Sequence, residues 1–148
     1  MSQEESRPIM YLFVNKGLGM SPGKMSAQVA HAAVESIFIS DPELVKTWRL
    51  PEKHYIKIVL EARNAEHLDT ISKYLEDRKI KTVRIIDEGL TEIEPHQVTA
   101  LGVEVVDRNV VGKTFESFSL YKPELDIKVV FRWNIMELYV VNLIKVLV

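Results

Sequence analysis

Residues 9–15 restrict the possible folds of this chain more than any other segment. Their sequence, IMYLFVN, is a continuous apolar run that ends at one polar residue. Strands with one face in water alternate between apolar and polar residues, whereas strands buried on both faces are apolar throughout. The run therefore predicts a strand that is covered on both faces by other parts of the chain.

Strand and helix patterns alternate along the rest of the sequence. Strands are predicted at residues 9–15, 55–60, 82–86 and 98–106, and helices at residues 22–38, 42–48 and 65–79. Strands separated by helices favour parallel pairing through right-handed crossovers. The direction of the last strand stays open, because it follows a loop that contains Pro95. This order predicts a single α/β domain, in which a small mixed β-sheet of four strands is flanked by α-helices.

Composition and charge narrow the class of protein. The chain has 148 residues, enough for one domain with a hydrophobic core. Its formal net charge is −2, so any contact with nucleic acid must come from a local patch of basic residues. It contains no cysteine, which excludes disulfides and thiol catalysis and fits a reducing compartment. No signal peptide or membrane-spanning tract is apparent, so we expect a cytoplasmic protein.

The predicted helix that begins at residue 22 carries a polar stripe and an unusual cation. Ser21 and Pro22 suit the N-cap and the first helical position. Lys24 then falls in the first turn, where a cation opposes the helix dipole but can help to hold an anion. Four polar residues recur at helical spacing on one stripe: Lys24, Gln28, His31 and Glu35. Because nearly all other residues of the helix are apolar or small, we expect it to be buried on most sides, with the stripe lining a cleft.

Two residues from a distant loop are predicted to face this stripe. Ligands bind beyond the carboxyl ends of the strands in sheets of this type. If the third strand runs parallel to the first, its end brings Asp87 to the edge where Lys24 lies, and Thr91 follows in the same loop. A lysine, a carboxylate and a hydroxyl then converge. Taken singly, each loop residue has a simpler explanation, because Asp87 precedes a turn glycine and Thr91 suits a loop cap.

Physical arguments count against two short motif matches, and a serine hydrolase stays as the third alternative. GLGMSPGKM resembles a phosphate-binding P-loop, but Leu18 replaces its first glycine and Met25 replaces the magnesium-binding hydroxyl residue. Residues 19–23 match the G-x-S-x-G elbow of serine hydrolases. However, the oxyanion hole of that elbow uses the backbone N–H of the residue after the serine, and Pro22 has none. An N-cap therefore explains this serine better than a nucleophile does.

The other titratable residues indicate no metal site. The four histidines lack the paired spacing of zinc ligands. Glu92 and Glu94 are interpreted as solvated charges of the loop.

Two longer motifs resemble a known family. GKMSAQVAHAAV is similar to the GK-x-A-A-Q-x-x-H-A-A signature of the type II peptidyl-tRNA hydrolases, the archaeal and eukaryotic form. DEGLTEIEPHQVTALGV resembles that family's D-A-G-x-T-x-I-x-P-x-x-x-T-x-L-G-I segment. Trp48 and Lys57 also match family positions. The resemblance covers about residues 9–106, some two thirds of the chain.

The resemblance implies a function and a set of site residues. Members of the family have a four-stranded mixed sheet flanked by helices, and are often homodimers. They cleave the ester between a peptide and the 3′ ribose of tRNA, so the implied partner is tRNA, with no metal, organic cofactor or membrane. By motif position, the catalytic residues fall on Lys24, Asp87 and Thr91, and further substrate-binding positions fall on Gln28, His31 and Thr99.

Three family cations are absent from this chain. Where the family usually has lysine, lysine and arginine, this sequence has Gly19, Pro22 and Leu90, and Glu92 replaces a glutamine. Since phosphate contacts dominate affinity for nucleic acid, we expect tRNA binding to be weaker or differently arranged. The alternative to a hydrolase is therefore a catalytically weakened relative that binds RNA ends or a protein through the same cleft.

The chain is predicted to have three parts. Residues 1–8 are polar and are expected to form a disordered leader, and residues 9–106 form the hydrolase-like α/β domain. Residues 107–148 depart from the family pattern and form a C-terminal extension of unknown packing. The last fourteen residues are apolar enough to need a partner surface.

Overall fold

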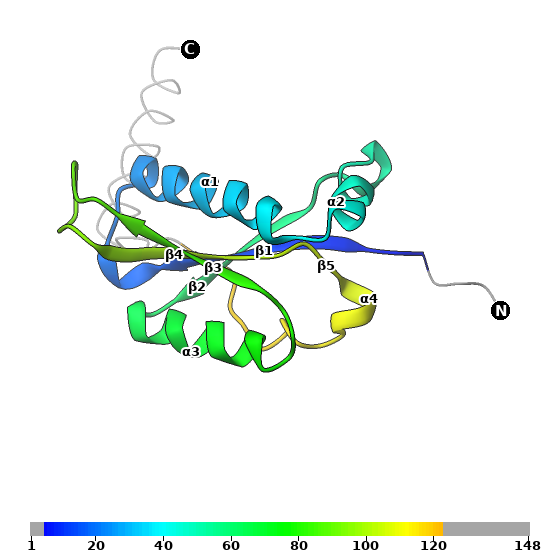
Figure 1. The fold of residues 1–148 in the computed structure, drawn as a ribbon. Coiled ribbons are helices and arrows are strands. Elements are labelled where there is room, and N and C mark those ends of the chain that lie inside the picture. The colour runs from blue at the N-terminus through cyan, green and yellow to red at the C-terminus, as the bar shows by residue number, and fades with distance from the viewer. Residues whose placement is uncertain (1–4, 123–148) are drawn as a thin grey trace, which may run out of the picture.

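A computed structural model describes residues 5–122 and shows a mixed β-sheet with helices on both faces (Figure 1). The strands are β1 (Pro8–Asn15), β2 (Lys57–Ala62), β3 (Thr82–Asp87), β4 (Gln97–Val103) and the short β5 (Val106–Asp107). Their order is β2-β1-β4-β3, and β5 pairs with the start of β1. Strands β1 and β2 are parallel, and β4 runs antiparallel to both β1 and β3. The predicted α/β fold with a four-stranded mixed sheet is confirmed, and β5 is an addition to it.

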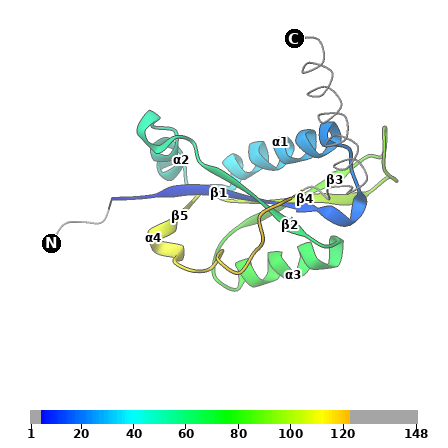
Figure 2. The same cartoon turned by 180° about the vertical axis from the view of Figure 1, so that it is seen from behind.

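Two layers of helices enclose the sheet. Helices α1 (Pro22–Ile39) and α2 (Pro42–Trp48) lie on one face, and α3 (Ala65–Glu76) and α4 (Arg108–Val111) lie on the other, as the view from behind also shows (Figure 2). Two 3-10 helices, Lys16–Leu18 and Pro51–Lys53, occupy loops. Capping side chains set the starts of the three longest helices, namely Ser21, Asp41 and Asn64. None of the helices in residues 5–122 has the length and apolar character needed to cross a membrane.

Strand β1 is the centre of the molecule, and all eight of its residues are buried. Its alternate side chains enter two separate cores, as the period of a strand requires. Met10 and Leu12 lie in the core beneath α1 and α2, whereas Tyr11 and Phe13 lie in the core formed with α3. The prediction of a strand buried on both faces is confirmed.

Strand β4 brings the ends of β1 and β3 to the same edge of the sheet. Because β4 is antiparallel to both neighbours, β1 and β3 point in the same direction. Asn15 ends β1 and Asp87 ends β3, and the Asn15 side-chain amide donates to the Val98 carbonyl at 2.8 Å, which joins this edge to β4. The loop into α1 and the loop after β3 therefore leave the sheet together.

Helix α1 lies very close to β4 at Gly102. A Cβ atom at this position would lie 2.3 Å from the Ser36 hydroxyl and 2.7 Å from the Ala32 carbonyl oxygen. Only glycine permits this approach without a shift of the backbone. The contact fixes the distance of α1 from the sheet, and with it the position of the polar stripe.

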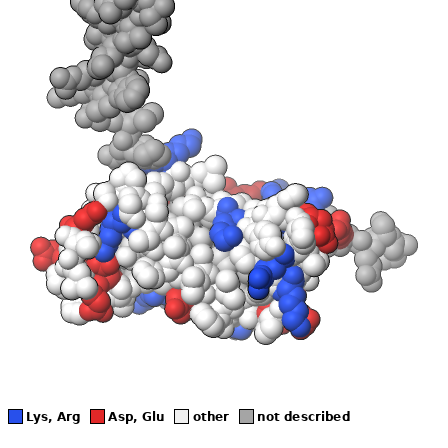
Figure 3. Space-filling model, turned by 90° about the horizontal axis from the view of Figure 1, so that it is seen from above, with Lys and Arg blue, Asp and Glu red and all other residues white. Residues whose placement is uncertain are grey.

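The outer face of α1 is apolar and exposed, so the prediction that this helix is buried on most sides is wrong. Gln28, Ala32 and Ser36 are the buried residues of α1, whereas Val34 is 52% exposed and Phe38 is 77% exposed. The view from above shows a largely uncharged surface on this side of the molecule (Figure 3). The prediction failed because only one side of α1, centred on Gln28, Ala32 and Ser36, packs against the sheet, and no other element of residues 5–122 covers the outer side.

Both ends of the described chain pack against the domain. The Ser6 hydroxyl and the Arg7 N–H donate to the Asp107 carboxylate, at 2.5 and 3.2 Å. The ring of Phe115 stacks on Tyr11 with centroids 3.8 Å apart. Residues 5–8, placed in the predicted leader, and residues 107–122, placed in the predicted extension, are therefore in contact with the sheet or its cores. Residues 1–4 and 123–148, which include the apolar last fourteen, lie outside the described residues.

Candidate functional site

A cleft of about 840 Å³ lies between α1 and the loop of residues 88–96, which joins β3 to β4. Its lining includes the whole predicted stripe of α1: Lys24, Gln28, His31 and Glu35. Asp87 and Thr91 line it from the opposite side. The prediction that the stripe faces a cleft is confirmed, and the structure brings the distant loop residues to it.

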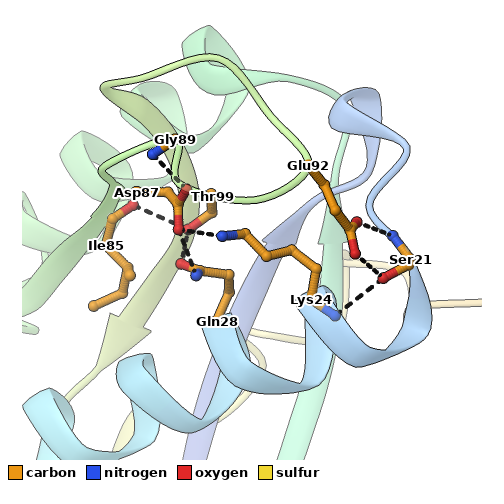
Figure 4. A network of polar contacts seen from close by, with 8 residues as sticks. All are labelled: Ser21, Lys24, Gln28, Ile85, Asp87, Gly89, Glu92 and Thr99. Carbon is orange, nitrogen blue, oxygen red and sulfur yellow. Dashed lines mark hydrogen bonds and ion pairs between the residues drawn. The ribbon is translucent and has the colours of Figure 1, made fainter.

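Lys24 and Asp87 form an ion pair inside this cleft (Figure 4). The Lys24 ammonium nitrogen is 2.5 Å from Asp87 Oδ2, and each side chain is only 11% exposed. Lys24 lies here because Ser21 and Pro22 begin the helix beside the end of β1. Asp87 lies here because it is the last residue of β3. Two residues far apart in the sequence therefore meet at one edge of the sheet.

Both oxygens of the Asp87 carboxylate accept hydrogen bonds. Oδ2 accepts from Lys24 and from the Gln28 side-chain amide at 3.0 Å, and Oδ1 accepts from the Gly89 N–H at 2.8 Å. The hydrogen bond from Lys24, followed by that from Gly89, lowers the pKa of Asp87 below its ordinary value. The carboxylate is therefore anionic at neutral pH and is better suited to orient a water molecule than to take a proton from it.

Replacing Lys24 by methionine should raise the pKa of Asp87 toward its ordinary value of about 3.9, because the main cause of the lowered value is removed. A carboxyl whose pKa is lower in the folded chain stabilises that chain above about pH 4, and this contribution is lost as the pH falls through the folded pKa. A carbon-13 NMR titration of the Asp87 carboxyl in wild type and Lys24→Met measures the difference. Equal pKa values in the two proteins would contradict the assignment of the shift to Lys24.

A buried hydroxyl orients the Gln28 amide. The Thr99 hydroxyl is 2.5 Å from Gln28 Oε1 and 3.3 Å from the Ile85 carbonyl oxygen, so its single proton is best placed for the glutamine. With its oxygen held by Thr99, Gln28 must present its NH2 group to Asp87. Thr99 is fully buried and does not line the cleft. We therefore expect it to act through Gln28 rather than on a bound molecule.

Thr91 and His31 line the cleft as exposed side chains. Neither side chain makes a hydrogen bond to another residue within the described range 5–122. Both are therefore available to a molecule that enters the cleft.

Sequence reasoning missed three charged residues of the cleft, Arg84, Glu88 and Glu92, and two of them make ionic or hydrogen-bonded contacts. Glu92 was interpreted as a solvated charge, but its carboxylate accepts hydrogen bonds from the N–H and the hydroxyl of Ser21 across the cleft. Arg84 lines the cleft from β3 and forms an ion pair with Asp69 at 2.9 Å. The alternation of polar and apolar residues along β3 was a signal for Arg84, whereas the contact of Glu92 depends on the tertiary fold.

The predicted N-cap role of Ser21 is confirmed. Its hydroxyl accepts the Lys24 N–H at 3.2 Å and donates to Glu92, and no histidine of the described residues bonds to it. A serine nucleophile needs a neighbouring base, and histidine does not fill that position here. Within residues 5–122, no three His, Cys, Asp or Glu side chains are grouped closely enough to hold a metal ion.

Comparison with known proteins gives consistent matches. The family model described as peptidyl-tRNA hydrolase PTH2 matches residues 9–121. A peptidyl-tRNA hydrolase of Thermococcus onnurineus is 35% identical over 105 residues, which cover 69% of this chain and 87% of the relative. One from Pyrobaculum aerophilum is 34% identical over 118 residues, 76% of this chain and 97% of the relative. A probable peptidyl-tRNA hydrolase 2 of Schizosaccharomyces pombe is 32% identical over 120 residues, 79% of this chain and 58% of the relative.

Proposed function

Because the chain belongs to the peptidyl-tRNA hydrolase PTH2 family, we propose that it hydrolyses peptidyl-tRNA in the cleft between α1 and the 88–96 loop. The observation that carries this proposal is the contact between Lys24 and Asp87, which places a cation and an oriented carboxylate in one cleft. The alternative of a catalytically weakened binding module is not supported, because relatives matched over most of their length are described as hydrolases.

Hydrolysis of the ester requires an oriented water and stabilisation of a developing negative charge. The oxygen of the water attacks the ester carbonyl carbon, and the carbonyl oxygen becomes an oxyanion. Collapse of this intermediate breaks the bond between the carbonyl carbon and the ribose 3′ oxygen. One proton of the attacking water ends on that oxygen, and the other is released to the solvent as the product acid ionises. The products are the peptide carboxylate and tRNA with a free 3′ hydroxyl.

The residues of the cleft are suited to these steps. Asp87 accepts hydrogen bonds strongly and can orient the attacking water. The Lys24 ammonium group, next to it, can stabilise the oxyanion or hold the phosphate of the terminal nucleotide. The exposed Thr91 hydroxyl can bind the water or the carbonyl, and the exposed His31 can contact substrate further along α1.

A direct assay tests the proposal. Purified protein is incubated with labelled N-acetyl-aminoacyl-tRNA. Two products are then measured: the released N-acetyl amino acid, and the fraction of tRNA that can be aminoacylated again. We expect release well above the spontaneous rate of ester hydrolysis, and unchanged release by Lys46→Ala, which alters an exposed pair on α2. Release at the spontaneous rate would refute the proposed function.

We propose that the tRNA end contacts the cleft through few cations. Among the described residues, Lys24 and Arg84 are the lysine and arginine that line it. Gly19 has φ of +58° and caps the 3-10 helix Lys16–Leu18, so a side chain in place of this glycine meets backbone strain. Pro22 occupies the first turn of α1, where it favours the helix start. Fewer phosphate contacts predict a shallow dependence of tRNA affinity on salt.

We also propose that the chain acts in the cytoplasm, where peptidyl-tRNA arises during translation.

We further propose that the chain forms a homodimer through the outer face of α1. Val34 and Phe38 are one helical turn apart and exposed, and Ile37 lies beside them. Contiguous exposed apolar side chains mark interaction surfaces.

Replacing Phe38 by glutamate should shift the protein from dimer to monomer, because a charge in an apolar interface must lose its hydration. Light scattering with size-exclusion chromatography measures the change of mass. Glu35→Gln is the matched control from the polar stripe of the same helix and should leave the mass unchanged. A wild-type monomer at high protein concentration would contradict the dimer.

A further inference from the structure

The 88–96 loop is held at its base and at one point near its middle. At the base, the His96 N–H donates to the Asp87 carbonyl at 2.8 Å, and the Gly89 N–H donates to the Asp87 carboxylate. Near its middle, Glu92 lies across the cleft mouth against the start of α1 (Figure 4). Within the described part of the chain, the Glu92 contacts are the hydrogen bonds that join residues 88–95 to a helix. We call these contacts, between Glu92 and Ser21, the Glu92 latch.

The Glu92 latch consists of two hydrogen bonds to one residue. The Ser21 N–H donates to Glu92 Oε2 at 2.9 Å, and the Ser21 hydroxyl donates to Oε1. The same hydroxyl oxygen accepts the Lys24 N–H at 3.2 Å. Ser21 is therefore bonded to the loop on one side and to the first turn of α1 on the other.

This arrangement completes a helix cap that the helix itself cannot complete. In a capping box, the N-cap serine accepts the N–H of the third helical residue, whose Glu or Gln side chain accepts the N–H of the serine in return. In α1 the third helical residue is Lys24, which cannot accept a hydrogen bond. Glu92, far away in the sequence, accepts the Ser21 N–H in its place. The position of Lys24 in the cleft and the contact of Glu92 are thus two parts of one local arrangement.

We propose that Glu92 is a positioning residue of the hydrolase, which holds the loop that carries Thr91 against the helix that carries Lys24; this rests on the proposed function. Thr91 precedes Glu92, so its distance from Lys24 depends on whether the latch is closed. Glu92 touches neither Lys24 nor Asp87 through a hydrogen bond in the described structure, and it acts through Ser21. The pKa of Glu92 is lowered by its hydrogen bonds from Ser21, so the latch stays ionised at neutral pH.

Kinetics of three variants on N-acetyl-aminoacyl-tRNA test the role in the reaction. We expect Glu92→Ala to lower kcat by about tenfold to a hundredfold, because small errors in the placing of reactive groups are costly. KM should change by less than about threefold. Glu92→Gln should recover most of kcat, since its amide oxygen can still accept the Ser21 N–H. Glu94→Ala removes the same charge from an exposed position of the same loop and should match wild type.

Amide hydrogen exchange tests the latch without substrate. In the full chain, Glu92→Ala should speed exchange of the Ser21 N–H, which loses its acceptor, at least about tenfold, and Glu94→Ala should not. Unchanged exchange in Glu92→Ala would overturn the proposal, and so would a kcat of Glu92→Ala equal to that of Glu94→Ala. A kcat of Glu92→Ala above that of wild type would also overturn it, because the contact would then be inhibitory. If wild type fails to cleave the substrate, the proposed function fails, while the exchange result still decides whether the latch exists.

Discussion

Replacing Asp87 by asparagine should lower kcat for peptidyl-tRNA by about 10²- to 10⁴-fold with little change in tRNA affinity. The amide has nearly the same size, so the Gly89 N–H can still donate to its oxygen. In the wild type, Lys24 and Gln28 both donate to Asp87 Oδ2. In the variant, the NH2 group of the asparagine takes the place of that oxygen and must face these two donors. The variant loses both the negative charge and the free acceptor capacity that orient water. Single-turnover hydrolysis and filter binding of tRNA separate the two effects.

Asp77→Asn is the control for this experiment. It makes the same chemical change at an exposed residue that follows α3, on the other face of the sheet. We expect it to leave turnover and stability near wild type. If kcat of Asp87→Asn stays within about threefold of the control, Asp87 has no part in catalysis and serves only as a structural residue of the turn.

The sequence was sufficient for those features that depend on local patterns. The apolar run of β1 indicated burial on both faces, and Ser21 with Pro22 indicated where α1 begins. The convergence of Lys24 with Asp87 needed one further fact, that β1 and β3 are parallel, and the antiparallel β4 between them supplies it. The crossover rules for strands joined by helices were enough to anticipate that direction.

The features that sequence reasoning missed depend on contacts between distant segments. No local pattern shows that Gly102 lets α1 approach the sheet on a single stripe, which leaves Phe38 exposed. Nor does a pattern show that Glu92 lies within reach of Ser21. A lysine at the third position of a capped helix was a usable signal, because it left the N-cap N–H without its usual acceptor. It could indicate that an acceptor was needed, but not which residue supplies it.

Replacing Lys24 by alanine should lower both kcat and the affinity for tRNA, whereas Asp87→Asn should lower kcat alone. We expect kcat to fall by about 10²- to 10³-fold, because the oxyanion loses a preorganised cation in a largely enclosed position. Affinity for tRNA should fall about tenfold, as expected for the loss of one charged hydrogen bond to phosphate. Lys46→Ala, which removes an exposed lysine from α2, is the control. Hydrolysis and tRNA binding are measured as before.

The combination of the two variants then shows whether Lys24 and Asp87 act as one unit. Since their side chains are in contact, the effects of Lys24→Ala and Asp87→Asn should not add, and the double variant should be little worse than the poorer single one. In Lys24→Ala the ionised Asp87 remains in the cleft without its cation and repels both the oxyanion and the phosphate of the tRNA end. Neutralising that carboxylate in the double variant should therefore restore part of the tRNA affinity that Lys24→Ala loses. Additive losses in both kcat and affinity would show instead that the two groups act independently, although their side chains are in contact.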